Sequence, residues 1–369
     1  MPKRILELDG LRGLAAILVL IAHYFGETTH GFRPLTAGWI GVDLFFVLSG
    51  FLIGTIILDN HDKPGFFWKF YLRRGARIVP VYGIVCILTL AAVALTAGHE
   101  WSDHPIDFWI YGSFSTNIAM TLWGGGGEWL KPTWTLAVEE QFYLVMPVLI
   151  AITPRRTLLP LLILLFCGSL AFRLGFASTH PQAALTLLPG RSDLLIAGVA
   201  LALLHGSLDL KRYVLPLRLL SVASIACMLA VILIIPGSAG TLGQTLLSIG
   251  IASFIGAIIG GAPEGSRYKA PWLRWFGRIS YALYLVHQPI AGLLHGLLLN
   301  GTPDVGTYAQ VTVSLLAAGV SVAAAWASWR WLESPVLKLA RALRFENEYE
   351  AGNLREPASD PRSLQPAQS

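Results

Sequence analysis

The chain is divided into long apolar runs that are separated by short polar segments. Most of these runs approach the roughly 20 apolar residues that an α-helix needs to cross the hydrocarbon core of a membrane. The pattern therefore predicts an all-α integral membrane protein, a polytopic bundle of about ten transmembrane helices. We predict the spans over residues 11–28, 39–58, 78–97, 133–151, 157–176, 190–205, 214–235, 241–261, 279–299 and 310–332.

The composition agrees with a chain whose surroundings are mostly lipid. Hydrophobic residues make up 54% of the 369 residues, and Asp, Glu, Lys and Arg together only 13%, about half the share found in soluble domains. This excludes an ordinary soluble enzyme, a disordered chain and a basic nucleic-acid binder, although the net charge is +5 and the pI near 9.2. We expect membrane lipids, and no nucleic acid, among the partners.

The basic residues are distributed unevenly between the two sides of the predicted bundle. With the N-terminus in the cytoplasm, the outer loops hold only Arg33 and Lys131, whereas every cytoplasmic segment holds lysine or arginine. This satisfies the rule that cytoplasmic loops carry the positive charge. We therefore expect both termini in the cytoplasm and a multi-pass protein of the bacterial cytoplasmic (inner) membrane.

Two regions of different composition follow each other along the chain. Residues 1–344 form the predicted membrane domain, and residues 345–369 are polar and almost free of aliphatic side chains, which predicts a disordered cytoplasmic tail. The three cysteines all lie inside predicted spans without the spacing of metal ligands or of a disulfide framework. We expect no metal site.

The first predicted span carries ionisable residues, which are costly in a membrane and indicate function. Arg12 and His23 are 11 residues apart, so they lie about 20° apart on one helix face and about 16 Å apart along the axis. Asp9 precedes Arg12 by three residues and can pair with it. The alternative is that His23 is an interfacial histidine near the end of the helix.

The fourth predicted span holds Glu139, Glu140 and Gln141 in an otherwise apolar run. Glu139 is expected at about the depth of His23, and a carboxylate that orients a histidine is the general-base arrangement of many acyl transfers. The alternative is a buried structural acid that pairs with an arginine such as Arg191.

The segment before the third span is basic and rich in aromatic residues. Lys69, Arg73 and Arg77 recur every four residues, with Arg74 beside them, as on a helix lying in the membrane interface. Such a cluster either binds lipid headgroups or clamps the phosphates of a soluble donor.

Asp43, Ser49, Arg191, Asp193 and His287 are further polar residues inside predicted spans. Arg191 and Asp193 are most simply a buried pair, and His287 is expected near the middle of the membrane. Together with Glu140, Arg191 and Asp193 are candidates for contacts with a substrate.

Five sequence blocks together resemble the acyltransferase-3 family, whose members are integral membrane enzymes that O-acylate cell-surface glycans and related acceptors. The resemblance covers residues 5 to about 335. The blocks are LDGLRGLAAILVLIAHY (8–24), GVDLFFVLSGFLI (41–53), FYLRRGARIVPVY (70–82), PTWTLAVEEQFYLVMP (132–147) and ISYALYLVHQPI (279–290).

The resemblance implies a bundle of about ten spans enclosing a pore that admits an acyl-coenzyme A donor from the cytoplasm. It implies that His23 is the catalytic base, with Arg12 on the same span. Arg74 and Arg77 match the basic R-x-x-R element implicated in donor binding, with Arg73 next to them.

The same resemblance assigns the remaining motif positions. Glu139 matches the glutamate of the W-T-L-x-x-E block, and Tyr82 and His287 match further polar positions. We expect Tyr82 and His287, like Arg12 and the arginines at 73, 74 and 77, to contact the acyl-CoA donor. Many members carry a fused extracytoplasmic SGNH-type domain after the membrane part. The short tail here leads us to expect a stand-alone form that delivers the acyl group directly.

The expected reaction is O-acetyl transfer, with acetyl-CoA as a donor substrate and no permanently bound cofactor. Transfer either is direct or passes through an acyl-histidine intermediate. A sugar unit of an exopolysaccharide or lipopolysaccharide, often linked to a lipid, is the first choice of acceptor. Peptidoglycan, periplasmic glucans, lipo-oligosaccharides and macrolides are alternatives, and a transporter with a proton relay is the rival class. The outer-loop tryptophans Trp101, Trp109, Trp123 and Trp129 could stack on sugar rings, but tryptophan is common at the interfaces of any membrane protein.

Overall fold

A computed structural model describes residues 5–124, 127–235, 237–261 and 266–340. The predicted tail, residues 345–369, lies outside the described residues, as do the last four residues of the predicted membrane domain and the basic residues at positions 3 and 4. Within the described part of the chain, ten helices are long and apolar enough to cross a membrane, and there is no strand. The prediction of an all-α polytopic bundle is therefore confirmed.

The secondary structure consists of fourteen α-helices and six short π- or 3₁₀-helices labelled η, counted over the described residues. Their bounds are α1 Leu6–Ile21, η1 Ala22–Gly26, η2 Arg33–Trp39, α2 Ile40–Asn60, α3 Phe66–Thr96, α4 Phe108–Gly112, α5 Thr116–Trp123, α6 Thr133–Ile152, α7 Arg155–Phe176, α8 Pro181–Thr186, α9 Leu188–Ser207, η3 Leu210–Tyr213, α10 Val214–Ile234, η4 Ser238–Gly240, α11 Leu242–Gly261, η5 Arg267–Lys269, α12 Pro271–Leu299, α13 Tyr308–Ser328, η6 Trp329–Glu333 and α14 Ser334–Ala340.

The third helix differs from its prediction. The basic segment is not a separate interfacial helix, because α3 begins at Phe66 and continues without a break to Thr96. Pro80 lies inside it, where the loss of one backbone donor is tolerated. The arginines of this segment therefore lie on the first half of a spanning helix, and Arg74 and Arg77 line a cavity inside the bundle.

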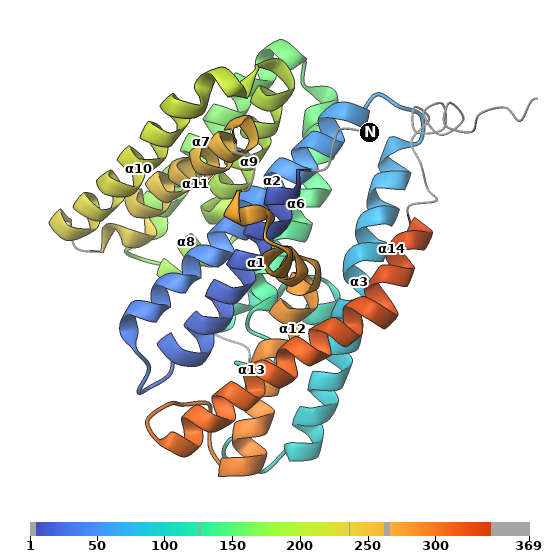
Figure 1. Cartoon of the computed structure of the whole chain (residues 1–369), viewed down its shortest axis with the longest axis vertical. Coiled ribbons are helices and arrows are strands. Elements are labelled where there is room, and N and C mark those ends of the chain that lie inside the picture. The colour runs from blue at the N-terminus through green and yellow to red at the C-terminus, as the bar shows by residue number, and fades with distance from the viewer. Residues whose placement is uncertain (1–4, 125–126, 236, 262–265, 341–369) are drawn as a thin grey trace, which may run out of the picture.

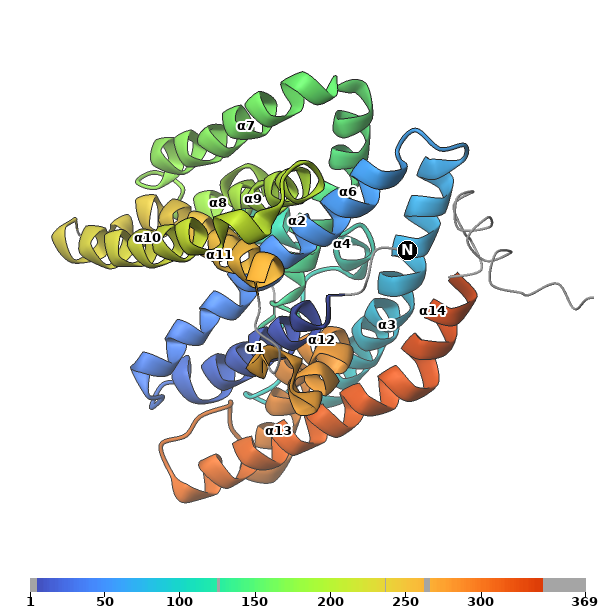
Figure 2. The same ribbon diagram turned by 45° about the horizontal axis from the view of Figure 1, so that its top comes forward.

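The helices pack in pairs that are visible in Figures 1 and 2. α2 lies along α9, α10 along α11, α1 along α12, and α12 along α13. α7 and α10 are largely exposed and lie on the outside of the bundle, as the turned view in Figure 2 shows. The most deeply buried spans are those of α1, α2, α6, α9 and α11, and α12 is nearly as buried.

Glycines let α1 and α12 approach closely. A Cβ atom on Gly13 would collide with the carbonyl oxygen of Leu273, and one on Gly277 would collide with the carbonyl oxygen of Asp9. Small residues at such contacts allow the van der Waals packing that drives helix association in lipid. The close crossing brings the far end of the first span, with His23, next to His287 on α12.

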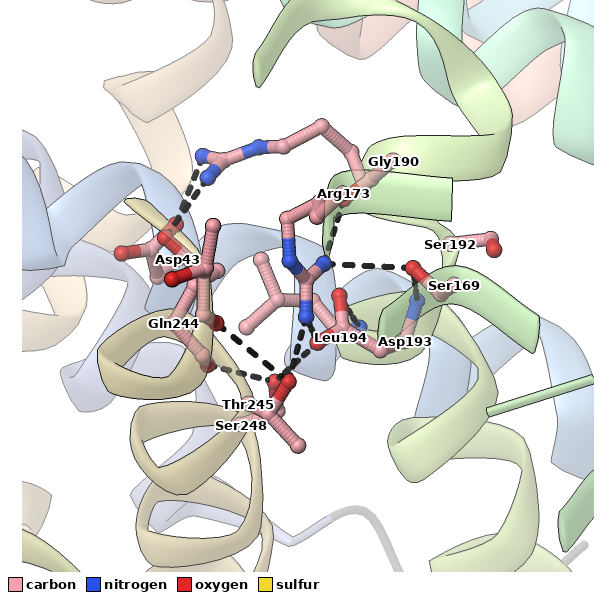
Figure 3. Close-up of polar contacts among 12 residues, drawn as sticks. Asp43, Ser169, Arg173, Gly190, Ser192, Asp193, Leu194, Gln244, Thr245 and Ser248 are labelled. Atoms are coloured by element: carbon pink, nitrogen blue, oxygen red, sulfur yellow. Dashed lines mark hydrogen bonds and ion pairs between the residues drawn. The ribbon is translucent and has the colours of Figure 1, made fainter. Parts of the chain in front are cut away.

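A buried ionic network joins α7, α9 and α11, as Figure 3 shows. The guanidinium of Arg173, which is fully buried on α7, donates to Asp193 Oδ2 on α9 at 2.7 Å. Arg173 also donates to the Gly190 carbonyl and to Thr245 on α11. Ser248 donates to the same Asp193 oxygen at 2.9 Å. Both members of the pair are 0% exposed.

A second pair extends the network to α2. Arg191 donates to Asp43 Oδ1 at 2.7 Å and to Gln244 Oε1 at 2.8 Å, so α9 is tied to α2 and α11 (Figure 3). The prediction that Arg191 pairs with Asp193 is wrong. Residues two apart on a helix point in nearly opposite directions and cannot meet, so each takes a partner on another helix.

The first testable prediction concerns this network. Arg173→Leu leaves Asp193 charged and buried without its cation, which should lower the free energy of unfolding by about 3–5 kcal/mol. Thermal unfolding of the purified protein in detergent measures the change. Arg212→Leu is the control, because its pair with Asp209 is exposed and surface pairs contribute little. Equal unfolding temperatures for the two variants would contradict the prediction.

Candidate functional site

Two histidines from distant parts of the chain meet between α1 and α12. His23 lies in the π-helix η1, and its Nδ1 is 3.0 Å from Nε2 of His287 on α12. Their ring centroids are 4.9 Å apart. Tyr24, the neighbour of His23, donates its hydroxyl to the His287 carbonyl at 2.6 Å. These contacts fix the two rings relative to each other.

The hydrogen bonds define which nitrogen of His23 is free. Nδ1 of His287 lies 3.2 Å from the carbonyl oxygen of Leu283, and a carbonyl only accepts, so this nitrogen carries the proton. In a neutral imidazole the other nitrogen, Nε2, is then an acceptor, and Nδ1–H of His23 donates to it. His23 Nε2 is left with a lone pair, which is what a general base requires.

The free nitrogen of His23 faces a cavity of about 420 Å³, which we call the histidine pocket. Glu27 contributes a carboxylate to this pocket, with Oε2 3.7 Å from His23 Nε2. Burial raises the pKa of the Glu27 carboxyl above its ordinary value, against the opposing effect of Lys131. The other lining residues are Trp39, Val42, Glu128, Pro132, Trp134, Thr135, Tyr284 and Gln288.

A second cavity, which we call the arginine chamber, lies on the side of the bundle where α1 and α3 begin. It holds about 730 Å³ of empty space, within the range of small-molecule sites. It is lined by Arg12, Val42, Phe45, Phe46, Ser49, Leu52, Arg74, Arg77, Ile78, Thr135, Leu136, Glu139, Tyr143, Ser280, Tyr281 and Tyr284.

The arginines that line the arginine chamber have few hydrogen-bond or ion-pair partners among the described residues. Among the described residues, no hydrogen bond or ion pair within 4 Å engages the guanidinium of Arg74 or Arg77, although Arg74 lies over the Tyr143 ring at 5.7 Å. The buried Nε of Arg12 has no hydrogen-bond partner in the same part of the chain. Guanidinium groups in this state bind phosphate and carboxylate groups well.

Glu139 belongs to the arginine chamber. Its Oε2 accepts a hydrogen bond from Tyr143 at 3.0 Å, and Ser49 and Arg12 also lie in contact or electrostatic range. The contact with His23 that the sequence led us to expect is absent among the described residues, because Glu139 lies one helical turn deeper than Thr135, where the histidine pocket ends. Glu139 therefore lies with the arginines and not beside His23.

The two cavities adjoin. Val42, Thr135 and Tyr284 line both of them. Thr135 and Tyr284 are joined by a hydrogen bond of 2.8 Å between their hydroxyl groups. These three side chains form the wall between the arginine chamber and the free nitrogen of His23.

Several residues that were expected to contact the acyl-CoA donor lie away from the arginine chamber. Arg73 does not line the arginine chamber. Tyr82 donates its hydroxyl to the carbonyl of Tyr111 and stacks on Phe114, so it packs α3 against α4. His287, which was also expected at the donor, instead contacts His23.

The expected substrate contacts also lie elsewhere. Glu140 lines neither cavity, and Arg191 and Asp193 belong to the buried network. Two of the four outer-loop tryptophans that were considered for sugar stacking, Trp101 and Trp129, are buried at 6% and 5% exposure and pack against glycines of α12. The indole rings at the histidine pocket are those of Trp39 and Trp134.

Sequence reasoning missed Glu27, Trp39 and Tyr284. Glu27 follows His23 by four residues, which is the spacing of a side-chain pair on a helix, so this signal was present. Tyr284 lies in the block around His287, three residues before it. Trp39 carried no local signal, because its place beside His23 depends on the fold of the loop between the first two spans.

Comparison with known proteins shows the family of the chain. Residues 5–330 match the family described as acyltransferase domain, the same family that the five sequence blocks resemble. The chain is 27% identical to the peptidoglycan O-acetyltransferase OatA of Listeria monocytogenes over 91% of its own length and 56% of the relative. It is 26% identical to the O-acetyltransferase OatA of Staphylococcus aureus over 91% and 58%. The chain thus spans somewhat more than half of these relatives. No solved structure matches it.

The hydrogen-bond chain through His287 gives a second testable prediction. ¹⁵N NMR of histidine-labelled protein in nanodiscs should show His23 protonated at Nδ1 and unprotonated at Nε2 at neutral pH. His287→Leu removes the acceptor for that proton and should shift His23 toward the form protonated at Nε2. His180→Leu is the control, because His180 is exposed and lies outside both cavities. An unchanged His23 signal in His287→Leu would contradict the assignment.

Proposed function

Because the chain belongs to the acyltransferase-3 family, we propose that it is a membrane O-acetyltransferase that moves an acetyl group from acetyl-CoA to a hydroxyl of a cell-surface sugar. The observation that carries the proposal is the adjoining pair of cavities. One offers unpaired arginines to an anionic donor, and the other offers the lone pair of a histidine to an alcohol.

The negative phosphates of acetyl-CoA complement the positive arginines of the arginine chamber. In our proposal the phosphates of acetyl-CoA bind Arg74 and Arg77, near the end of the bundle where the positive-inside rule places the cytoplasm. Arg12, deeper in the same chamber, attracts the remaining negative charge. The thioester then points toward the wall formed by Val42, Thr135 and Tyr284, beyond which His23 lies.

The chemistry follows from the free nitrogen. His23 Nε2 takes the proton of the acceptor hydroxyl, and the oxygen attacks the carbonyl carbon of the thioester. The carbon–sulfur bond breaks, and coenzyme A leaves as a thiolate that receives the proton from His23. The hydrogen bond to His287 holds the ring in the tautomer that keeps Nε2 free. The products are an O-acetyl ester and coenzyme A.

The acceptor is proposed at the class level. The sugar units of an exopolysaccharide remain our first choice. The name of the Listeria relative adds peptidoglycan as a second acceptor to be tested. In both cases the reacting group is a sugar hydroxyl, which the histidine pocket must hold next to His23.

The third prediction tests the base. His23→Ala should lower transfer of radiolabelled acetyl from acetyl-CoA to a glycan by about 10²–10⁴-fold, the usual contribution of a positioned general base. The assay uses purified protein in nanodiscs without an ion gradient, so turnover also separates an enzyme from a transporter. His180→Ala is the matched control. Near-normal transfer by well-folded His23→Ala would refute the proposal.

The fourth prediction tests the donor site. Arg74→Ala with Arg77→Ala removes two charged hydrogen-bond donors and should raise the KM for acetyl-CoA by at least about tenfold. The kcat should change less, because the histidine pocket is untouched. Lys69→Ala removes one charge from the same helix outside the arginine chamber and serves as the control. If the KM of the double variant equals that of the control, the arginines do not bind the donor.

A further inference from the structure

The histidine pocket holds a second group able to bind a hydroxyl, at a fixed distance from the catalytic nitrogen. We propose that Glu27 binds the hydroxyl next to the one that is acetylated, and that the pocket thus selects a sugar with two neighbouring hydroxyls, its ring lying on Trp39. The inference rests on the proposed function, because it describes the acceptor of that reaction.

The spacing of the two groups supports a diol. His23 Nε2 and Glu27 Oε2 are 3.7 Å apart, which is too long for a direct hydrogen bond. Both atoms belong to residues that line the same cavity. Neighbouring hydroxyl oxygens of a sugar ring are separated by about the length of a hydrogen bond, so one can face each group. The hydroxyl on His23 is the one that reacts.

The chemistry of Glu27 suits this role. An ionised carboxylate only accepts hydrogen bonds, and a hydroxyl that donates to a charged acceptor is held more strongly than one that donates to a neutral group. The charged or titratable groups that face Glu27 are His23, Glu128 and Lys131, and Trp39 lines the same cavity. Lys131 itself is paired with Glu128 at 2.9 Å.

Trp39 offers a flat surface beside Glu27. Its ring stacks on Trp134 with a centroid distance of 5.9 Å and an interplanar angle of 21°. Trp134 is only 5% exposed, whereas Trp39 is 36% exposed, so the outer of the two rings is the one that a ligand reaches. Arg191 lies 5.6 Å from both ring centroids and fixes them from inside the bundle, where Asp43 holds it. A rigid, backed aromatic face of this kind suits the apolar face of a sugar.

The test uses small sugars as probes. Wild-type protein in nanodiscs is given acetyl-CoA and the methyl glycosides of glucose, galactose, mannose and N-acetylglucosamine, and the best acceptor is then compared with its single-deoxy analogues. One analogue, which lacks the hydroxyl next to the acetylated one, should lose about tenfold to a hundredfold in kcat/KM, the effect of one hydrogen bond to a charged group.

Glu27→Ala should lower kcat/KM for the parent sugar by a similar factor and cause no further loss with that same analogue. Glu27→Gln, which keeps the size and an acceptor oxygen, should lose less. The KM for acetyl-CoA should not change in either variant. Glu100→Ala removes an exposed acid outside both cavities and is the matched control. Trp39→Leu should raise the KM for the sugar, and Trp39→Phe, which keeps an aromatic ring, should raise it less.

Three other results would overturn either the role of Glu27 or the proposed function. If Glu27→Ala slows the parent sugar and every deoxy analogue equally, Glu27 acts on His23 and not on the acceptor, and the inference is overturned. It is also overturned if acetyl-CoA is hydrolysed but none of the glycosides is acetylated. If wild-type protein neither hydrolyses nor transfers, and His23→Ala behaves like wild type, the proposed function itself fails.

Discussion

A charge that is moved from water into an apolar interior must be compensated, and this constraint organises the bundle. In the scaffold the compensation comes from the protein. Arg173 pairs with Asp193 and Arg191 pairs with Asp43, and Ser248 and Gln244 add hydrogen bonds to these pairs. In the arginine chamber the compensation is incomplete, because Glu139 is shared by more than one arginine. The charges of the buried network are thus neutralised within the protein, whereas the arginines of the chamber can still bind an anion.

The buried network and the histidine pocket are physically connected through Arg191. Its guanidinium is held by Asp43 and Gln244 inside the bundle, while its face lies against Trp39 and Trp134 at the histidine pocket. Arginine suits this position because its planar group bonds in its own plane and stacks through its face. A residue that the sequence marked as a candidate substrate contact therefore supports the pocket from behind.

Much of the architecture could be predicted from the sequence, because uncharged apolar runs of about 20 residues rarely form anything except membrane spans. The partners of the ionisable residues could not. A helical wheel shows which side chains share a face, as for Arg12 and His23, but not which other helix that face meets. The error at Arg191 and Asp193 was avoidable, since their spacing forbids a contact. The expected contact between Glu139 and His23 could not be checked in this way. It depended on the relative depth of two helices in the membrane, and one helical turn separates the two cavities.

The π-helix at the end of the first span determines where His23 lies. η1 covers Ala22–Gly26, and a turn of this kind is wider than an α-turn and redirects the side chains that follow it. π-segments persist mainly at functional sites, since their backbone is less stable than a regular helix. Here the segment carries His23 and leads into Glu27, and Tyr24 anchors it to the His287 carbonyl and to Ser321 on α13. The sequence offset between Arg12 and His23 therefore describes a straight helix that the chain does not form. The side chain of His23 lines the histidine pocket, where, in our proposal, the acceptor enters.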